Sequence, residues 1–476
     1  MRQIAAIALL ALRTTFRSRV VLVLSALLFV AAFLLPGAIR GDGTPEGLVR
    51  LHLTYSLGIA GFLLALSNLW AGCAAVSQEA DDKTLQLLLV KPVPRFRIWL
   101  GKWLALLLVN ALLLALVGTV VAVALHAKLL RGGFEAEALA AARQTTLASL
   151  QTLRAPLPDV EAAVRAEYES LRARGQLPEN IAANTILDSI RRTQLARLYS
   201  IAPGASLSWS FALPPVQAKR SPGVLVLQCK ADSSVPGAAD IQTAIELHAG
   251  DQTLARELRA MPGTVQTLVF SGIPADARQA DVVVHNHGTH DATLFFDPSE
   301  GLVLRQPDGT FAGNYLRALL QLFLRLALFA AIGITLGTLF SMPVASFLAL
   351  VLILILQLSG FIASAAQVDR ATFVANVAPF AAPAHAHGEE QPPAAEPSFL
   401  ARAAANVFYY AYRGTYLTLR PLLEDRTIDA LATGTCLPPR ALARNLLHQG
   451  LLLPLVLGLL ATAVLRRREW ARPNIN

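Results

Sequence analysis

Two short stretches of the chain are rich in histidine, a side chain that often ligates metals in proteins. One is HNHGTH, which contains His285, His287 and His290, and the other is HAHGEE at residues 385–390. Neutral imidazoles bind copper or zinc well. However, the first stretch ends a strand-like run, and the second lies in a linker rich in Ala and Pro. The sequence therefore favours solvated turns and predicts no metal site, with His285, His287 and His290 as the residues to examine.

No motif for enzymatic chemistry is found in the sequence. The serines of YSIAPGASLSWS are not part of a G-x-S-x-G nucleophile elbow, and no H-E-x-x-H zinc motif occurs. Lys102 follows Gly101, but position 96 is Phe, so this pair is not part of a G-x-x-x-x-G-K-[ST] loop that could hold phosphates. We therefore predict that the chain is not an enzyme, has no catalytic residues and binds no cofactor of its own.

The stretch QEADDKTLQLLLVKPVPRFRIWLGK, residues 78–102, lies between two long apolar segments and is unusually charged for a short loop. Residues 79–90 can form an amphipathic helix with Leu85, Leu88 and Leu89 on one face and Asp82 away from it. Pro92 would end this helix, because proline disfavours helical conformation in the residue before it. From these residues alone, a solvated loop with basic membrane anchors is the simpler interpretation.

The composition indicates an integral membrane protein. The chain has 476 residues, of which 54% are hydrophobic and 15% charged, and its mean hydropathy is +0.49; soluble domains have about 25% charged residues. The net charge of +9 fits basic residues at the cytoplasmic ends of spans, and no nucleic-acid-binding signature accompanies it. Three cysteines do not make a disulfide framework.

The predicted fold is an α-helical polytopic membrane protein of six transmembrane helices with an inserted extracytoplasmic domain. The expected spans are residues 20–36, 53–76, 103–125, 316–340, 344–362 and 451–465. Basic residues precede the first span, lie between the second and third, and follow the sixth. This pattern places the loop 77–102 and both termini in the cytoplasm and the protein in the inner membrane. The expected boundaries are 1–126, 127–314, 315–365, 366–449 and 450–476, the second and fourth segments being outside.

The outer segment 127–314 divides into a helical part at 134–200 and a β-sandwich at 205–306. In the helical part, Leu147, Leu150 and Leu153 recur at helical spacing. In the second part, seven short strand-like runs are separated by Gly, Pro, Asp or Ser. The other outer segment begins with an Ala/Pro-rich linker, followed by an amphipathic helix expected to lie at the lipid interface.

Four of the polar side chains within the expected spans are candidates for a role in function or helix pairing. Arg325 is a functional-site candidate because charges inside a membrane are costly, although a later start of its span would let it reach the outer interface instead. Asn68, Asn110 and Gln357 are expected to pair between helices rather than to bind substrate.

The loop resembles the cytoplasmic loop of the type-2 ABC exporter permeases, closest to those linked to multicopper-enzyme maturation. The matching residues are Glu79, Thr84, Leu85, Leu87, Leu88, Leu89, Pro92, Val93, Arg95, Gly101 and Lys102. Lys83 stands where that family usually has Gly. The stretches ALRTTFRSRV, GTLFSMPVASFLAL and LRRREW resemble, in turn, the N-terminal elbow, the turn between spans four and five, and the basic cytoplasmic end of these permeases.

This resemblance implies a permease that performs no chemistry, with ATP and Mg bound by a separate ATPase subunit that docks on the loop. Glu79 and Asp82 would offer charges to that subunit, and Leu85 and Leu88 an apolar contact. Two permeases, alike or different, would form the pore within membrane lipid, and the outer domain would contact substrate or an envelope partner. Two rivals stay open: a membrane-anchored scaffold that displays the β-sandwich, and an ATP-independent secondary transporter.

Overall fold

The structure is a computed structural model, and it describes most of the chain in two compact units. The described residues are 2–17, 42–82, 93–177, 183–214, 223–235, 241–274, 276–288, 291–357, 399–423 and 425–467, together with 23, 26–28, 30, 31 and 370. The first unit comprises Met1–Ser149, Gly309–Gly360 and Pro421–Asn476, and the second comprises Leu150–Asp308 and Phe361–Arg420.

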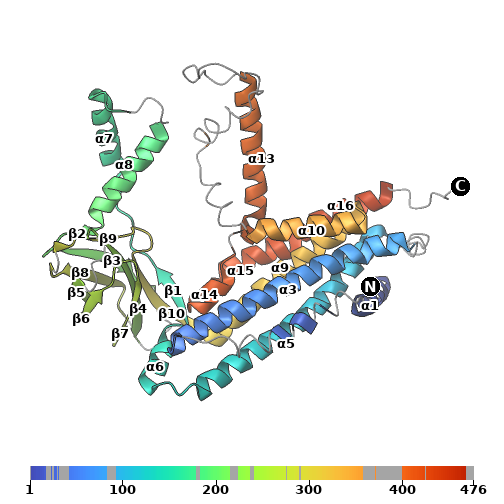
Figure 1. Ribbon diagram of the computed structural model, residues 1–476, viewed down its shortest axis with the longest axis horizontal. Helices are drawn as coiled ribbons and strands as arrows, with labels where there is room; N and C mark the ends of the chain where they lie inside the picture. The colour runs from blue at the N-terminus through green and yellow to red at the C-terminus, as the bar shows by residue number, and fades with distance from the viewer. Residues whose placement is uncertain are drawn as a thin grey trace. The chain divides into compact units, whose positions relative to one another are not determined.

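The first unit is built from helices. They are α1 (Arg2–Arg17), α3 (Pro45–Asp81), α5 (Arg95–Arg131), α6 (Ala136–Gln144), α9 (Phe311–Leu339), α10 (Met342–Gln357), α14 (Thr427–Ala432), α15 (Pro439–Asn445), the π-helix η3 (Leu446–Leu452) and α16 (Leu453–Arg467). Helix α9 packs along α3, α5 and α16 (Figure 1). Thr44 begins α3 by capping it, since its hydroxyl accepts a hydrogen bond from the Gly47 amide at 3.0 Å.

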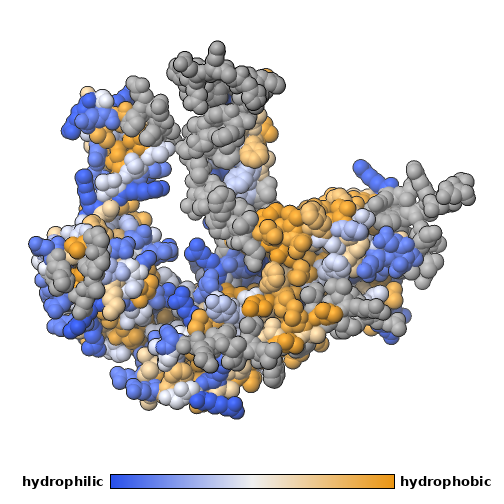
Figure 2. Space-filling view, viewed as in Figure 1, coloured by the Kyte–Doolittle hydropathy of each residue, from blue (hydrophilic) through white to orange (hydrophobic). Residues whose placement is uncertain are grey.

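Four helices in the described residues are long and apolar enough to cross a membrane: Pro45–Asp81, Arg95–Arg131, Phe311–Leu339 and Pro439–Arg467. A shorter apolar helix, Met342–Leu356, accompanies them. Figure 2 shows apolar side chains gathered on the surface of this unit. Leu108 and Leu112 of α5 are among the exposed leucines. These features fit a membrane protein. The first expected span, 20–36, lies mostly outside the described residues, so the number of six spans stays a prediction.

Helices α3 and α9 approach each other closely where both carry glycine. A Cβ atom on Gly333 would lie 2.7 Å from the carbonyl oxygen of Leu69, and one on Gly337 would lie 2.4 Å from that of Cys73. Small residues let helix backbones come together in membranes, where van der Waals packing drives association. These glycines therefore fix the distance between the two helices.

The second unit contains two antiparallel sheets. Its strands are β1 (Ala148–Leu153), β2 (Ser200–Ile201), β3 (Ser206–Ala212), β4 (Val224–Ser233), β5 (Ile241–Ala249), β6 (Gln252–Ala260), β7 (Val265–Ser271), β8 (Gln279–Asn286), β9 (Leu294–Phe296) and β10 (Leu302–Thr310). One sheet has the order β1-β10-β4-β9-β2, with β7 also paired to β4, and the other has the order β3-β8-β5-β6. All seven predicted strand-like runs lie in strands.

Both sheets contribute to one cluster of buried residues. Phe211, Ile245 and Val282 come from the four-stranded sheet, and Leu227 and Leu304 come from the other. Cys229 belongs to the same cluster, and all three cysteines of the chain are free and buried. Burial raises the pKa of the Cys229 thiol to about 12.

The expectation of a helix through Leu147, Leu150 and Leu153 is wrong. Residues 148–153 form strand β1, which pairs with β10, and Leu150 and Leu153 are buried there. Leucines three residues apart fit one face of a helix, but β10 offers this segment backbone partners, and such tertiary pairing overrides local preference.

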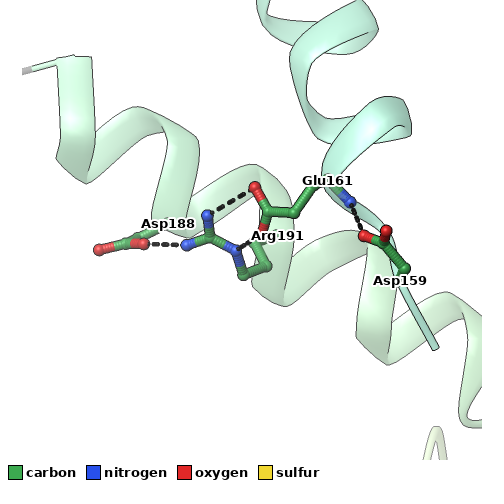
Figure 3. A network of polar contacts seen from close by, with 4 residues as sticks. All are labelled: Asp159, Glu161, Asp188 and Arg191. Carbon is green, nitrogen blue, oxygen red and sulfur yellow. Dashed lines mark hydrogen bonds and ion pairs between the residues drawn. The ribbon is translucent and has the colours of Figure 1, made fainter. Parts of the chain in front are cut away.

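Helices α7 (Glu161–Ala173) and α8 (Ala183–Leu198) pack through Val164, Ile186 and Ile190. Arg191 of α8 also joins them, because its Nε donates to Glu161 of α7 at 2.7 Å, while its Nη1 donates to Asp188 of its own helix (Figure 3). The hydrogen bond from Arg191 lowers the pKa of Glu161. A further helix, α13 (Phe399–Leu423), lies where the amphipathic helix was expected, and the Ala/Pro-rich linker lies outside the described residues.

Candidate functional site

The candidate site is the base of the loop that joins α3 to α5. Helix α3 ends at Asp81 and α5 begins at Arg95. The predicted loop residues Thr84, Leu85, Leu87, Leu88, Leu89 and Pro92 lie outside the described residues. The structure does place Glu79, Asp82, Arg95, Gly101 and Lys102, and it brings Glu79 and Lys102 together.

Glu79 and Lys102 form an ion pair across the two helices. The Nζ atom of Lys102 lies 2.5 Å from Oε1 of Glu79, and it also donates a hydrogen bond to the Ala75 carbonyl at 2.6 Å. The Lys102 side chain is 2% exposed and that of Glu79 is 16% exposed. A cation removed from water in this way needs a close counter-charge. The pair therefore closes the base of the loop.

The first turns of α5 also contact α1 and α16. A Cβ atom on Gly101 would lie 2.8 Å from Cγ2 of Ile7, so Gly101 lets α1 approach α5. Arg97 donates to the Gln3 side chain at 2.8 Å, and Arg95 donates to the carbonyl of Leu465 in α16. Both arginines therefore bond to protein groups of neighbouring helices.

The first turns of α5 also carry a stack of three aromatic rings. The Trp99 ring lies 6.0 Å from that of Phe96 and 5.6 Å from that of Trp103, measured between centroids. Trp103 donates to the carbonyl of Ala327 in α9 at 2.9 Å. Trp99 belongs to one buried cluster with residues of α3, α9 and α16, including Ile334 and others. The start of α5 therefore contacts α1, α3, α9 and α16.

The acidic residues next to Glu79 have a different environment. Asp81 and Asp82 are both exposed at the end of α3. The backbone N–H of Asp82 bonds to the Gln78 carbonyl at 2.8 Å, which continues the helical pattern to that point. Two carboxylates are therefore presented to solvent where the loop begins, while Glu79 is directed inward.

Asn68 and Asn110 pair between helices, as the sequence predicts. The Asn110 amide donates to the Asn68 side-chain oxygen at 2.8 Å, and Asn68 donates in turn to the carbonyl of Leu326 in α9. Both side chains are buried. This chain of hydrogen bonds joins α3, α5 and α9. The side chain of Gln357 lies outside the described residues.

Arg325 of α9 pairs with Asp425, just before α14. Its Nη1 lies 3.2 Å from Oδ2 of Asp425, and the two side chains are 27% and 5% exposed. Sequence reasoning missed Asp425, because Glu424 and Asp429 lie beside it and no pattern selects one of the three. Arg325 also lines a cavity of about 490 Å³ within the helical unit.

The histidines predicted as solvated turns are placed in part. Nε2 of His285 lies 3.7 Å from Oε2 of Glu246, and that carboxylate is also 3.5 Å from Nε2 of His248. His287 is exposed, and His290 lies outside the described residues. Among the residues with a described placement, no group of three metal-ligating side chains could hold a metal ion.

Comparison with known families supports a transporter. Residues 5–148 match the family model described as ABC-2 family transporter protein. The matched segment includes almost all of α1, all of α3 and α5, and both ends of the loop. No curated protein and no solved structure matches the chain. The match supports an integral membrane protein of the ABC-2 permease type, the membrane component of an ABC transporter, and gives no support for a copper-maturation subtype.

Proposed function

We propose that the chain is the permease subunit of an ABC exporter, driven by a separate ATPase subunit that docks on the loop between α3 and α5. The carrying observation is that the family match covers both helices that hold this loop, and that Glu79 and Lys102 close its base. ATP and Mg would be bound by the partner, since the chain has no phosphate-binding loop of its own.

The contacts at the base of the loop could transmit a movement of the loop to the apolar helices. The ion pair joins the end of α3 to the start of α5, so a push on the loop would move both helices together. Arg95 reaches α16 and Trp103 reaches α9, so that movement would be passed to the other apolar helices. Close-packed interiors transmit such displacements because they deform little.

The proposed docking surface consists of the exposed carboxylates of Asp81 and Asp82 and the leucines predicted to follow them, Leu85 and Leu88. Opposite charges on the ATPase would steer encounter and fix register, and the leucines would supply the apolar contact. Glu79 would not contact the ATPase itself; it would keep α3 joined to α5 through its ion pair with Lys102. Two permeases would form the pore in the inner membrane, with both termini cytoplasmic and the second unit outside.

The test is purification of the tagged chain from its native membranes in mild detergent, with mass spectrometry of what accompanies it. A stoichiometric Walker-type ATPase is expected with the wild type. The double variant Asp81→Lys/Asp82→Lys should lose this subunit, and Glu137→Lys, a charge reversal at an exposed position of α6, should keep it. Wild-type protein that is folded and free of any ATPase would contradict the proposal and favour the scaffold or the secondary transporter.

A further inference from the structure

The helical unit contains a cavity of about 490 Å³, a volume typical of small-molecule sites, which run from roughly 300 to 1,000 Å³. It is bounded by α3, α5, α9, α10 and α14. The residues that line it are Gly58, Ile59, Gly61, Phe62, Ala65, Leu114, Leu322, Arg325, Leu326, Phe329, Ile353, Leu356 and Ile428. Among these described residues, Arg325 alone carries a charge, so the cavity is an apolar space with one cationic group at its wall.

Arg325 is held in place by two neighbours. Its Nη1 pairs with Asp425 at 3.2 Å, and its guanidinium lies over the Phe329 ring, 5.6 Å from the centroid. Asp425 is itself fixed, because its Oδ1 accepts the Thr427 amide at 3.0 Å and the Thr427 hydroxyl. The guanidinium therefore keeps one orientation against the cavity.

The bonding of Arg325 is incomplete. Its Nε is buried, and no group among the described residues accepts its hydrogen. A buried donor without an acceptor is unfavourable, and the fork of an arginine matches the two oxygens of a carboxylate or phosphate. Of the Arg325 nitrogens, only Nη1 donates a hydrogen bond to Asp425, which leaves other N–H groups of the guanidinium for a second acceptor.

We infer that this cavity binds an amphiphile with a carboxylate or phosphate head group and an apolar chain. The head group would lie on the exposed part of the Arg325 side chain, which is 27% exposed, and the chain would lie among Phe62, Leu322 and Ile353. The inference rests on the proposed function in one respect: in a permease such an amphiphile is either cargo or a lipid held in the wall, and the two share this chemistry.

Two variants test the head-group contact and the space for the apolar chain separately. Arg325→Gln/Asp425→Asn removes both charges of the ion pair together, so no unpaired charge is left behind. Gly58→Leu fills the cavity from α3, and a Cβ atom at Gly58 meets no atom within 4 Å, so the helix can accept the larger side chain. The control is Arg317→Gln, an arginine of the same helix that bonds to Cys436 and Leu437 and does not line the cavity.

The experiment uses the full chain in nanodiscs of phosphatidylcholine, labelled with dodecanoate that carries a photoreactive diazirine on its chain. Labelled positions are mapped by mass spectrometry, and unlabelled dodecanoate or dodecanol is added as competitor. Thermal unfolding verifies that each variant is folded. We expect label on the residues lining the cavity, competition by dodecanoate at least about tenfold stronger than by dodecanol, and about a tenfold loss of label in both test variants. Arg317→Gln should label as the wild type does.

Label that is spread evenly over the lipid-facing residues of α5 and α10 would overturn the inference. So would equal competition by dodecanol, or folded test variants that label as strongly as the wild type. None of these results depends on an ATPase, so the binding inference and the proposed function can fail separately.

A second arm separates cargo from a held lipid in the complex with the co-purified ATPase. Loss of label from the cavity on addition of ATP and Mg identifies the amphiphile as cargo. Label that ATP does not change identifies a lipid bound in the wall, and both results retain the cavity as a binding site for this chemistry.

Discussion

The Nζ atom of Lys102 lies 2.5 Å from Oε1 of Glu79, and this contact joins the end of α3 to the first turns of α5. Both residues belong to the motif that the sequence singles out, but the sequence assigns Glu79 to an external partner. The inward orientation of Glu79 leaves Asp81 and Asp82 as the exposed charges. The ends of the two helices are therefore joined by a mostly buried ion pair, with two exposed carboxylates beside it.

Glu79→Gln should destabilise the protein more than Lys102→Met does. The first change leaves Lys102, 2% exposed, without its counter-charge, while the second leaves Glu79, 16% exposed, with more access to water. Removing one partner of a buried ion pair costs about 3 kcal/mol or more. Thermal unfolding in detergent measures the difference. The double variant should recover part of the loss, and Glu137→Gln is the exposed control; equal melting of Glu79→Gln and wild type would refute the structural role.

Alanine at Gly333 or Gly337 should separate α3 from α9. The added Cβ would lie 2.7 Å from the Leu69 carbonyl oxygen or 2.4 Å from that of Cys73, and both atoms belong to backbone that cannot move locally. Overpacking of this kind costs about 1–3 kcal/mol. The melting temperature reports it, and Gly58→Ala is the matched control because its Cβ meets no atom within 4 Å. Control and test variants that melt alike would contradict the close approach.

Asn110→Leu should weaken the bundle only moderately. It removes the donor that bonds Asn68 at 2.8 Å, while Asn68 keeps its bond to Leu326. Hydrogen bonds between membrane helices average about 0.6 kcal/mol and reach about 1.7 kcal/mol. A double-mutant cycle with Asn68→Leu measures the coupling between the two side chains. Additive losses would mean that the two amides do not interact.

Cys229 should make the second unit less stable at alkaline pH. Its folded-state pKa is raised from 9.0 to about 12, so above pH 9 the unfolded chain loses the thiol proton while the folded chain keeps it. The stability from this group is therefore complete below pH 9 and falls by up to about 1.4 kcal/mol per pH unit until the folded pKa is reached. Unfolding of the full chain followed from pH 8 to pH 10.5 should have a smaller slope in Cys229→Ala; identical slopes would exclude burial of the thiol as the cause.

The membrane class, the long apolar helices and the seven strand-like runs could be predicted from the sequence, because hydropathy and period-two alternation are properties of neighbouring residues. The strand β6, QTLARELRA, could not be predicted in this way. It is the edge strand of its sheet and mostly exposed, so it lacks an apolar alternation. Strand β1 was misassigned for a related reason, since pairing with β10 decides its conformation.

The loop between α3 and α5 was identified by its resemblance to the loop of ABC exporter permeases, whereas Arg325, Asn68 and Asn110 were identified by residue type as the polar residues to explain. Their partners came only from the tertiary structure: Lys102 for Glu79, Asp425 for Arg325, and the cavity beside that arginine. A charged side chain in an apolar segment can be predicted to have a partner, because an unpaired buried charge is costly. Which group meets that need depends on how helices distant in sequence pack together, and no local pattern carries that information.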